Sequence, residues 1–238
     1  MDIEYQIAAR SSESLKVTTG SAPLNSGFAV ILPQAGSQTP AGTLIYSLSQ
    51  KGVLVSEAAV SAVSTLAEAR IYVEKRGSLE TGIALANPGD NPVQVGLELF
   101  SASGDSLGST SFELAGQGHM ASFLNELEGL QAPSDFEGTM RVTSSSPTGL
   151  AVTGLRSRFN ERGDFLIAAT PTVSDANAVS ADLIFPHLVE GGGSVTQFVL
   201  LSGRGKLRFF RQLGQPLSLG LQGSQSSPVD LSKPSSPR

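Results

Sequence analysis

Apolar and polar residues alternate along the middle of the chain, and a period of two is typical of β-strands that bury one face. The alternation predicts seven strands, at 69–74, 79–86, 93–101, 108–114, 137–144, 148–157 and 164–169. The segments between them include "NPGDNP" and "SASGDS", which are rich in the residues that form turns. This part of the chain is therefore expected to form an all-β domain.

One segment has the period of a helix instead. In "HMASFLNELEGL", residues 119–130, the side chains of Met120, Phe123, Leu124 and Leu127 fall on one helical face. The expected fold class is therefore all-β, with immunoglobulin-like β-sandwich modules and one short helix that covers an open end. A barrel with a similar number of strands is the alternative, because strand patterns do not determine whether a sheet closes.

The C-terminal part of the chain repeats the beginning of this domain. The stretch "GSVTQFVLLS" matches "GSLETGIALA" when Gly193 is placed on Gly77. Further along, "KLRFFRQLGQPLSL" matches "GLELFSASGDSLGS" and places Gly214 on Gly104, which predicts a common turn. Residues 183–222 therefore correspond to the first half of the domain.

The N-terminal part repeats the end of the same domain. The stretch "PAGTLIYSLSQKGVLVSEA" matches a later stretch with Pro40 on Pro147, and "EYQIAARSSESL" matches "SFELAGQGHMASF" with Tyr5 on Phe112. Residues 1–62 therefore correspond to the second half of the domain.

These matches divide the chain into four segments. Residues 1–62 are the second half of a β-sandwich module, 70–172 are a complete module, 183–222 are the first half of a module, and 223–238 are a tail rich in Pro and Ser. Because the two halves are complementary in content, we expect two sandwich modules. One is intact, and the other is split between the N- and C-terminal segments.

The split falls inside one predicted strand. The candidate subunit-joining residues on its two sides are Ile3, Tyr5, Ile7, Leu217, Leu219 and Leu221. If the halves of one chain pair with each other, the result is a closed two-domain module. If they pair between chains, the contact is head-to-tail and need not close, so a homopolymer grows as a filament or surface array. The sequence leaves both arrangements open.

Composition excludes several partners. The net charge is −5, with 16 Lys and Arg against 21 Asp and Glu, and no basic cluster would follow a phosphate backbone, so nucleic acid is not an expected partner. There is no Cys, so no disulfide framework is possible. No apolar run is long enough for a membrane span, and the N-terminus lacks the pattern of a signal peptide.

Candidate chemistry is sparse. His119 and His187 lie in no catalytic or metal-binding spacing. Acidic residues in expected turns could hold calcium only if the fold clustered them: Asp90, Asp105, Asp135, Asp164, Asp175 and Asp182. The Arg-Gly-Asp triplet in "ERGD" is explained by a hairpin turn. We therefore expect no enzyme activity, no cofactor and no metal. Surface glycans stay open as ligands, although the chain has no Trp and only three Tyr.

The repeated stretches also carry a resemblance. "GSLETGIALANPGDNPVQVGLELFSASGDSL", "TPAGTLIYSLSQKGVLVSEA" and "FPHLVEGGGSVTQFVLL" resemble the repeated immunoglobulin-like β-sandwich modules of large secreted or surface proteins of environmental bacteria. The resemblance covers most of residues 3–222 and implies an extracellular or cell-surface location, with the mature form lacking a signal peptide. It implies a structural or adhesive role rather than a chemical reaction.

Overall fold

The computed structural model describes residues 3–17, 25–175, 182–201 and 205–219. Regular structure in these residues is almost entirely β-strand, so the predicted all-β class is confirmed. The strands are β1 (Thr43–Gln50), β2 (Val53–Ser61), β3 (Glu68–Arg76), β4 (Leu79–Ala86), β5 (Val93–Ser101), β6 (Ser106–Leu114), β7 (His119–Phe123), β8 (Asp135–Ser144), β9 (Ala151–Phe159), β10 (Phe165–Thr170) and β11 (Val173–Ser174).

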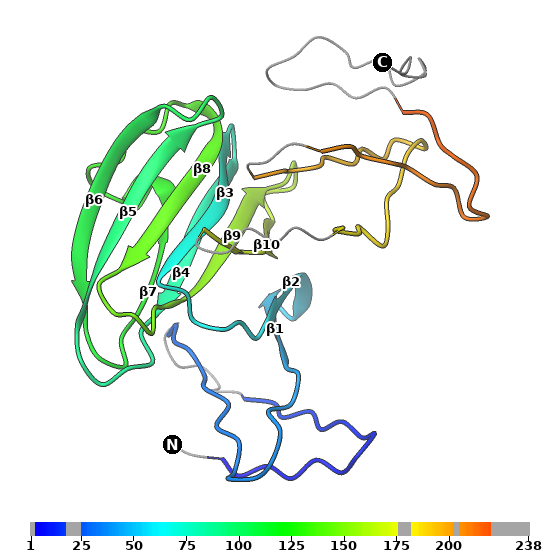
Figure 1. The fold of residues 1–238 in the computed structure, drawn as a ribbon. Coiled ribbons are helices and arrows are strands. Elements are labelled where there is room, and N and C mark those ends of the chain that lie inside the picture. Colours follow the sequence, from blue (N-terminus) through cyan, green and yellow to red (C-terminus); the bar gives the residue numbers. More distant parts are fainter. Residues whose placement is uncertain (1–2, 18–24, 176–181, 202–204, 220–238) are drawn as a thin grey trace, which may run out of the picture.

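Strands β3 to β11 form the intact module, residues 66–175, in which one antiparallel ladder folds over into two layers (Figure 1). The strand order is β10-β9-β4-β3-β8-β5-β6, with β7 beside β4 and β11 beside β3. Strands β3 and β4 pair only next to their turn, Lys75 with Glu80 and Arg76 with Leu79, and then separate into different layers. Because β10 and β6 end the order unpaired with each other, the module is an open sandwich rather than a closed barrel.

The core lies between the two layers, because alternate residues of each strand point inward. Its most buried strand side chains, each at most 2% exposed, are Ala69, Ile71, Val73, Val95, Leu97, Leu99, Met140 and Val142 from one layer and Ile83, Leu85 and Val152 from the other. Burial of one large aliphatic side chain contributes about 1.5–3 kcal/mol. The intact module therefore has a core of its own.

The predicted helix at 119–130 is wrong. Residues His119–Phe123 form β7, which pairs with β4 from Ala86 to Gly82. Only η1 (Leu124–Glu126), one turn of 3-10 helix, is helical, and it buries Leu124. Short apolar runs do not distinguish helix from strand by period alone, and here the open edge of β4 supplies backbone partners that an isolated helix would not use.

The two halves of the intact module are interleaved. Strands β3, β4 and β5 belong to the first half of the repeat, and β7 to β10 belong to the second. Yet β8 lies between β3 and β5, and β9 pairs with β4. Each layer therefore needs strands from both halves, and a half that is separated from the other can keep only its hairpins.

The flanking segments match this expectation. The N-terminal half-module, residues 3–62, has one hairpin of β1 and β2, and the rest of its described residues form no strand. The described residues of the C-terminal half-module, 182–219, contain only isolated bridges, Gly191 with Ser194 and Phe210 with Pro216. In Figure 1 the two half-modules extend from the intact module in different directions. No helix in the described ranges is long and apolar enough to cross a membrane.

Candidate subunit-joining site

The five predicted joining residues that the structure describes are not brought together within one chain. Ile3 and Ile7 are 52% and 38% exposed, and neither lies in a strand. Leu217 and Leu219 are half-buried, and the Leu217 N–H donates to the Phe209 carbonyl at 2.9 Å. Their segment lies far from the N-terminal segment in Figure 1. Tyr5 is also half-buried, and Leu221 lies outside the described residues. Pairing of these strands between chains stays a prediction.

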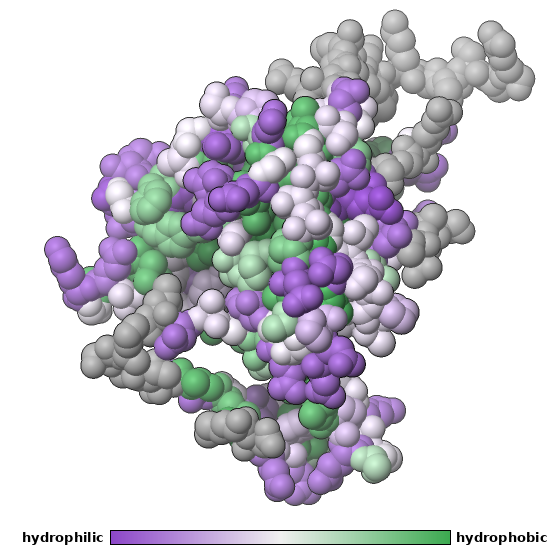
Figure 2. Space-filling view, turned by 90° about the vertical axis from the view of Figure 1, so that its left-hand side faces the viewer, coloured by the Kyte–Doolittle hydropathy of each residue, from purple (hydrophilic) through white to green (hydrophobic). Residues whose placement is uncertain are grey.

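Exposed apolar side chains are concentrated in the half-modules. In the described residues, the intact module exposes only Phe159 and Val173 among its large hydrophobic side chains. The others are Ile3, Ile7, Leu15, Val17, Phe28, Val30, Ile31, Leu32, Leu44, Ile45, Val53, Leu54, Val63, Leu183, Ile184, Phe185, Val189, Val195, Leu200, Phe210 and Leu213. Figure 2 shows hydrophilic and hydrophobic side chains interspersed at the surface, both over the main body and over the segment below it. Large contiguous apolar patches on a protein surface are typical of association sites.

The half-modules contain turns of the intact module, as the sequence predicts. The Arg211 N–H donates to the Gln215 carbonyl at 2.8 Å, and in β5 and β6 the equivalent Ser101 N–H donates to the Asp105 carbonyl at 2.8 Å. The glycine before each acceptor, Gly214 or Gly104, has a positive φ, 80° and 93°. The predicted common turn is therefore confirmed.

A second turn corrects the sequence alignment by one residue. Thr81 Oγ1 accepts from the Glu74 N–H and donates to the Glu74 carbonyl, at 2.9 and 3.1 Å. Thr196 Oγ1 makes the same two bonds to Val189, at 3.2 and 2.7 Å. This match places Gly192, and not Gly193, on Gly77, with φ values of 59° and 57°. Because residues 191–193 are all glycine, the side chains in this turn do not show which of the three corresponds to Gly77.

The C-terminal half-module is held together by three phenylalanine rings. The Phe198 ring lies 5.2 Å from that of Phe185 and 5.5 Å from that of Phe209, between centroids. The corrected alignment places Phe198 on the counterpart of β4 and Phe185 on the counterpart of β3. The common turn places Phe209 on the counterpart of β5. Phe209 is 7% exposed, although its half has no complete core. The three segments that correspond to β3, β4 and β5 are therefore in contact in the single chain, without a second copy.

Sequence reasoning missed the segment that corresponds to β8. The spacing that places Tyr5 on Phe112 and Pro40 on Pro147 also places residues 28–37 on β8. Its large apolar side chains, Phe28, Val30, Ile31 and Leu32, are exposed, and it forms no strand. Both partners of β8 are first-half strands, so this segment has no sheet partner in its own half. The sequence signal that could have identified this segment is the apolar run "FAVIL", which lies in the N-terminal half-module.

The two ends of the intact module lie side by side. Val173 of β11 pairs with Arg70 of β3, and the Arg70 guanidinium donates to both oxygens of Asp175, at 3.1 and 2.8 Å. Arg141 Nε lies 3.4 Å from the same carboxylate. The hydrogen bonds from Arg70 lower the pKa of Asp175. This ion pair fastens the exit of the module to its start.

We expect Asp175→Asn to release β11. A carboxyl with a lowered folded-state pKa stabilises the fold above its unfolded pKa, and that contribution is lost as the pH falls through the folded-state pKa. Hydrogen-exchange protection of the Val173 amide should therefore be high at neutral pH and fall in acid in the natural chain. It should be low at both pH values in the variant. Asp135→Asn, which removes the exposed pair with Arg76, is the control. Equal protection in the natural chain and Asp175→Asn would contradict the role of the carboxylate.

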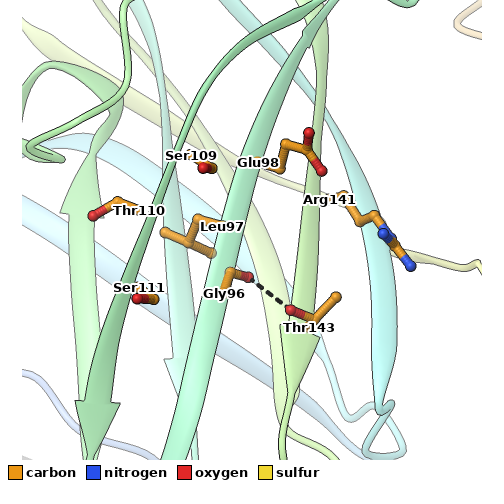
Figure 3. Close-up of a pocket in the computed structure, with 8 residues that line it drawn as sticks. All are labelled: Gly96, Leu97, Glu98, Ser109, Thr110, Ser111, Arg141 and Thr143. Atoms are coloured by element: carbon orange, nitrogen blue, oxygen red, sulfur yellow. Dashed lines mark hydrogen bonds between the residues drawn. The ribbon is translucent and has the colours of Figure 1, made fainter.

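A shallow hollow of about 580 Å³ lies on the outer surface of β5, β6 and β8 (Figure 3). Its floor is Gly96, whose carbonyl accepts from Thr143 Oγ1 at 3.4 Å. The full lining is Gly96, Leu97, Glu98, Ser109, Thr110, Ser111, Arg141 and Thr143. Arg141 is engaged with Glu68 at 2.9 Å, and no histidine lines the hollow. The carboxylate in the lining, Glu98, accepts a hydrogen bond from Ser106 Oγ at 3.0 Å.

The other sequence candidates have structural explanations. His119 lies in β7, where burial lowers its pKa. Carboxylates from expected turns bond to protein donors: Asp90 to Gln117, Asp105 to Ser103, Asp135 to Arg76, Asp164 to Asn160 and Asp175 to Arg70. His187 and Asp182 are exposed. Across the described ranges, no three His, Cys, Asp or Glu side chains are grouped as metal ligands would be.

The Arg-Gly-Asp triplet lies in the turn between β9 and β10, where the Asn160 N–H donates to the Asp164 carbonyl.

Comparisons with known proteins add little. No protein-family model matches the chain, and no curated protein matches it. The chain is similar to the crystal structure of Thermotoga maritima 1070, with 10% sequence identity and a TM-score of 0.39. The match covers 49% of this chain and 100% of that one. A likeness at this level supports no inference about function.

Proposed function

We propose that the protein is a non-enzymatic extracellular structural protein, a subunit of a filament or surface array at the cell surface. Each chain contributes an N-terminal half-module to one neighbour and a C-terminal half-module to the other. The intact module serves as a spacer between these joints. The contact is head-to-tail, so growth continues unless the chain of subunits closes.

The interleaving of strands in the intact module is the observation that carries this proposal. Strand β8 pairs with β3 and β5, and β9 pairs with β4, so neither half can build a layer alone. The described residues of the half-modules accordingly form one hairpin and isolated bridges but no layer, and they expose most of their large apolar side chains. Joining the halves would restore the missing partners.

The expected gain exceeds the cost of association. Removal of about 1,000 Å² of apolar surface from water contributes about 25 kcal/mol, whereas association costs roughly 4–15 kcal/mol before side-chain ordering is counted. New backbone hydrogen bonds along the added strands would act in the same direction. Mechanical strength would follow, because each joint is a sandwich and not a surface patch.

Sedimentation velocity and electron microscopy of the purified chain test the proposal. We expect a distribution of species that shifts to larger size as concentration rises, and linear particles in which intact modules recur at a regular spacing. A compact monomer whose sedimentation does not depend on concentration would overturn assembly between chains.

One observation favours a second candidate, a closed two-domain module that binds a ligand or mediates adhesion. The pairing of Val173 with Arg70 brings the two linkers to the same end of the intact module, as expected for a domain inserted into another. In that case the halves of one chain would close on each other. Surface glycans are the proposed ligand class for this candidate, and the compact monomer described above is its expected form.

A further inference from the structure

We infer that residues 28–37 of one chain act as a donor strand that enters between two segments of a second copy, 183–190 and 205–211. This inference rests on the proposed assembly and specifies its joint. The occupant of the C-terminal half-module is thus a defined segment of an identical chain.

The acceptor is identified by its equivalence to the intact module. The corrected alignment places 183–190 on β3, and the common turn places 205–211 on β5. In the intact module these two strands do not pair with each other, because β8 lies between them along their length. In the C-terminal half-module the middle position has no strand among the described residues.

The acceptor is already organised. The rings of Phe185, Phe198 and Phe209 hold the counterparts of β3, β4 and β5 together, while the apolar side chains of Leu183 and Ile184 are 83% exposed. A donor strand between the two outer segments would cover these side chains. Preorganisation of this kind lowers the ordering cost of binding.

The donor has matching properties. Val30 and Leu32 are 52% and 77% exposed, and the stretch "FAVIL" has no charged residue to bury. As the counterpart of a central strand, it requires a partner on both edges, and both of those partners belong to the other half of the repeat. A central strand leaves no free edge after it has been inserted.

Cross-linking between mixed chains tests this joint. The protein has no Cys, so single substitutions give unambiguous pairs. Chains with Leu32→Cys are mixed under assembling conditions with chains that carry either His187→Cys or Phe210→Cys, and a short bifunctional maleimide is added. Leu32 is the counterpart of Thr139, which lies opposite Tyr72 and Phe100, the counterparts of His187 and Phe210. We expect heterodimers with both acceptors, since side chains opposite each other on neighbouring strands lie about 5 Å apart. Each variant alone provides the background.

Val53→Cys is the matched donor control. Val53 is a comparably exposed aliphatic residue, at 65%, and it lies next to the β1–β2 turn, whose counterpart in the intact module leads into β10, a strand that pairs with neither β3 nor β5. We expect the yield with Leu32→Cys to exceed the yield with Val53→Cys by about tenfold, because strand neighbours more than three residues out of register are about 10 Å further apart.

The outcomes separate this inference from the proposed function. Cross-links from Leu32→Cys to both acceptor segments support the donor strand. Assembled chains in which Leu32→Cys reacts with neither segment, with only one, or no more than the control does would overturn it and leave assembly by another surface. Chains that stay monomeric would overturn the proposed function, and with it the joint between chains. A cross-link formed within monomers of a double variant would assign the same strand position to a closed module.

Discussion

A fragment of residues 64–175 is expected to fold as a stable monomer and to lose all assembly. It keeps both layers, the core and the ion pair that fastens β11 to β3, so its thermal unfolding should be cooperative, with a stability of about 5–15 kcal/mol as for other small domains. It lacks both half-modules, which carry nearly all exposed large apolar side chains of the described residues. Calorimetry and sedimentation of the fragment beside the full chain measure both properties.

The control for this fragment is the full chain with residues 1–10 removed. Under the proposed assembly, this deletion takes away the predicted joining segment around Ile3 and Ile7 and should weaken or abolish association while the intact module melts as before. A fragment 64–175 that is unfolded would show that the half-modules support the module. A fragment that assembles as the full chain does would place the contact on the module itself.

Two leucines at equivalent positions should respond in opposite ways to truncation. Leu85 is fully buried in β4, and Leu200, its counterpart, is 59% exposed. Leu85→Ala should destabilise the intact module by about 2–5 kcal/mol, because it removes buried contacts and leaves a cavity. Leu200→Ala should leave the melting of that module unchanged and should weaken assembly, because Leu200 becomes buried only when the split sandwich is completed.

Thermal unfolding of the fragment and sedimentation of the full chain distinguish the two effects. Leu54→Ala in β2, a residue 53% exposed whose counterpart Phe165 is only half-buried, gives the comparison for an apolar side chain outside the core. If Leu200→Ala assembled like the unchanged protein at every concentration, its position would not be part of a buried joint.

The sequence by itself determined seven of the nine strands of the intact module. Each of the seven predicted strands is present, with ends that differ by at most three residues, because the alternation that buries one face of a strand is a local pattern. The turn shared by Gly104 and Gly214 was also determined locally, since it depends on residues a few positions apart. The division into one whole and two partial repeats came from the same local patterns, matched across the chain.

Only the tertiary structure decided how these strands are combined. Residues 119–123 became β7 and not a helix because β4, far away in sequence, offers an open edge. The register of the glycine-rich turn was settled by the Thr196 hydroxyl, and the position of β8 between β3 and β5 is the observation from which we infer the role of 28–37. Strand partners are long-range contacts that side-chain period does not specify, so a sequence can predict that two halves belong together without showing which strand of one lies between which strands of the other.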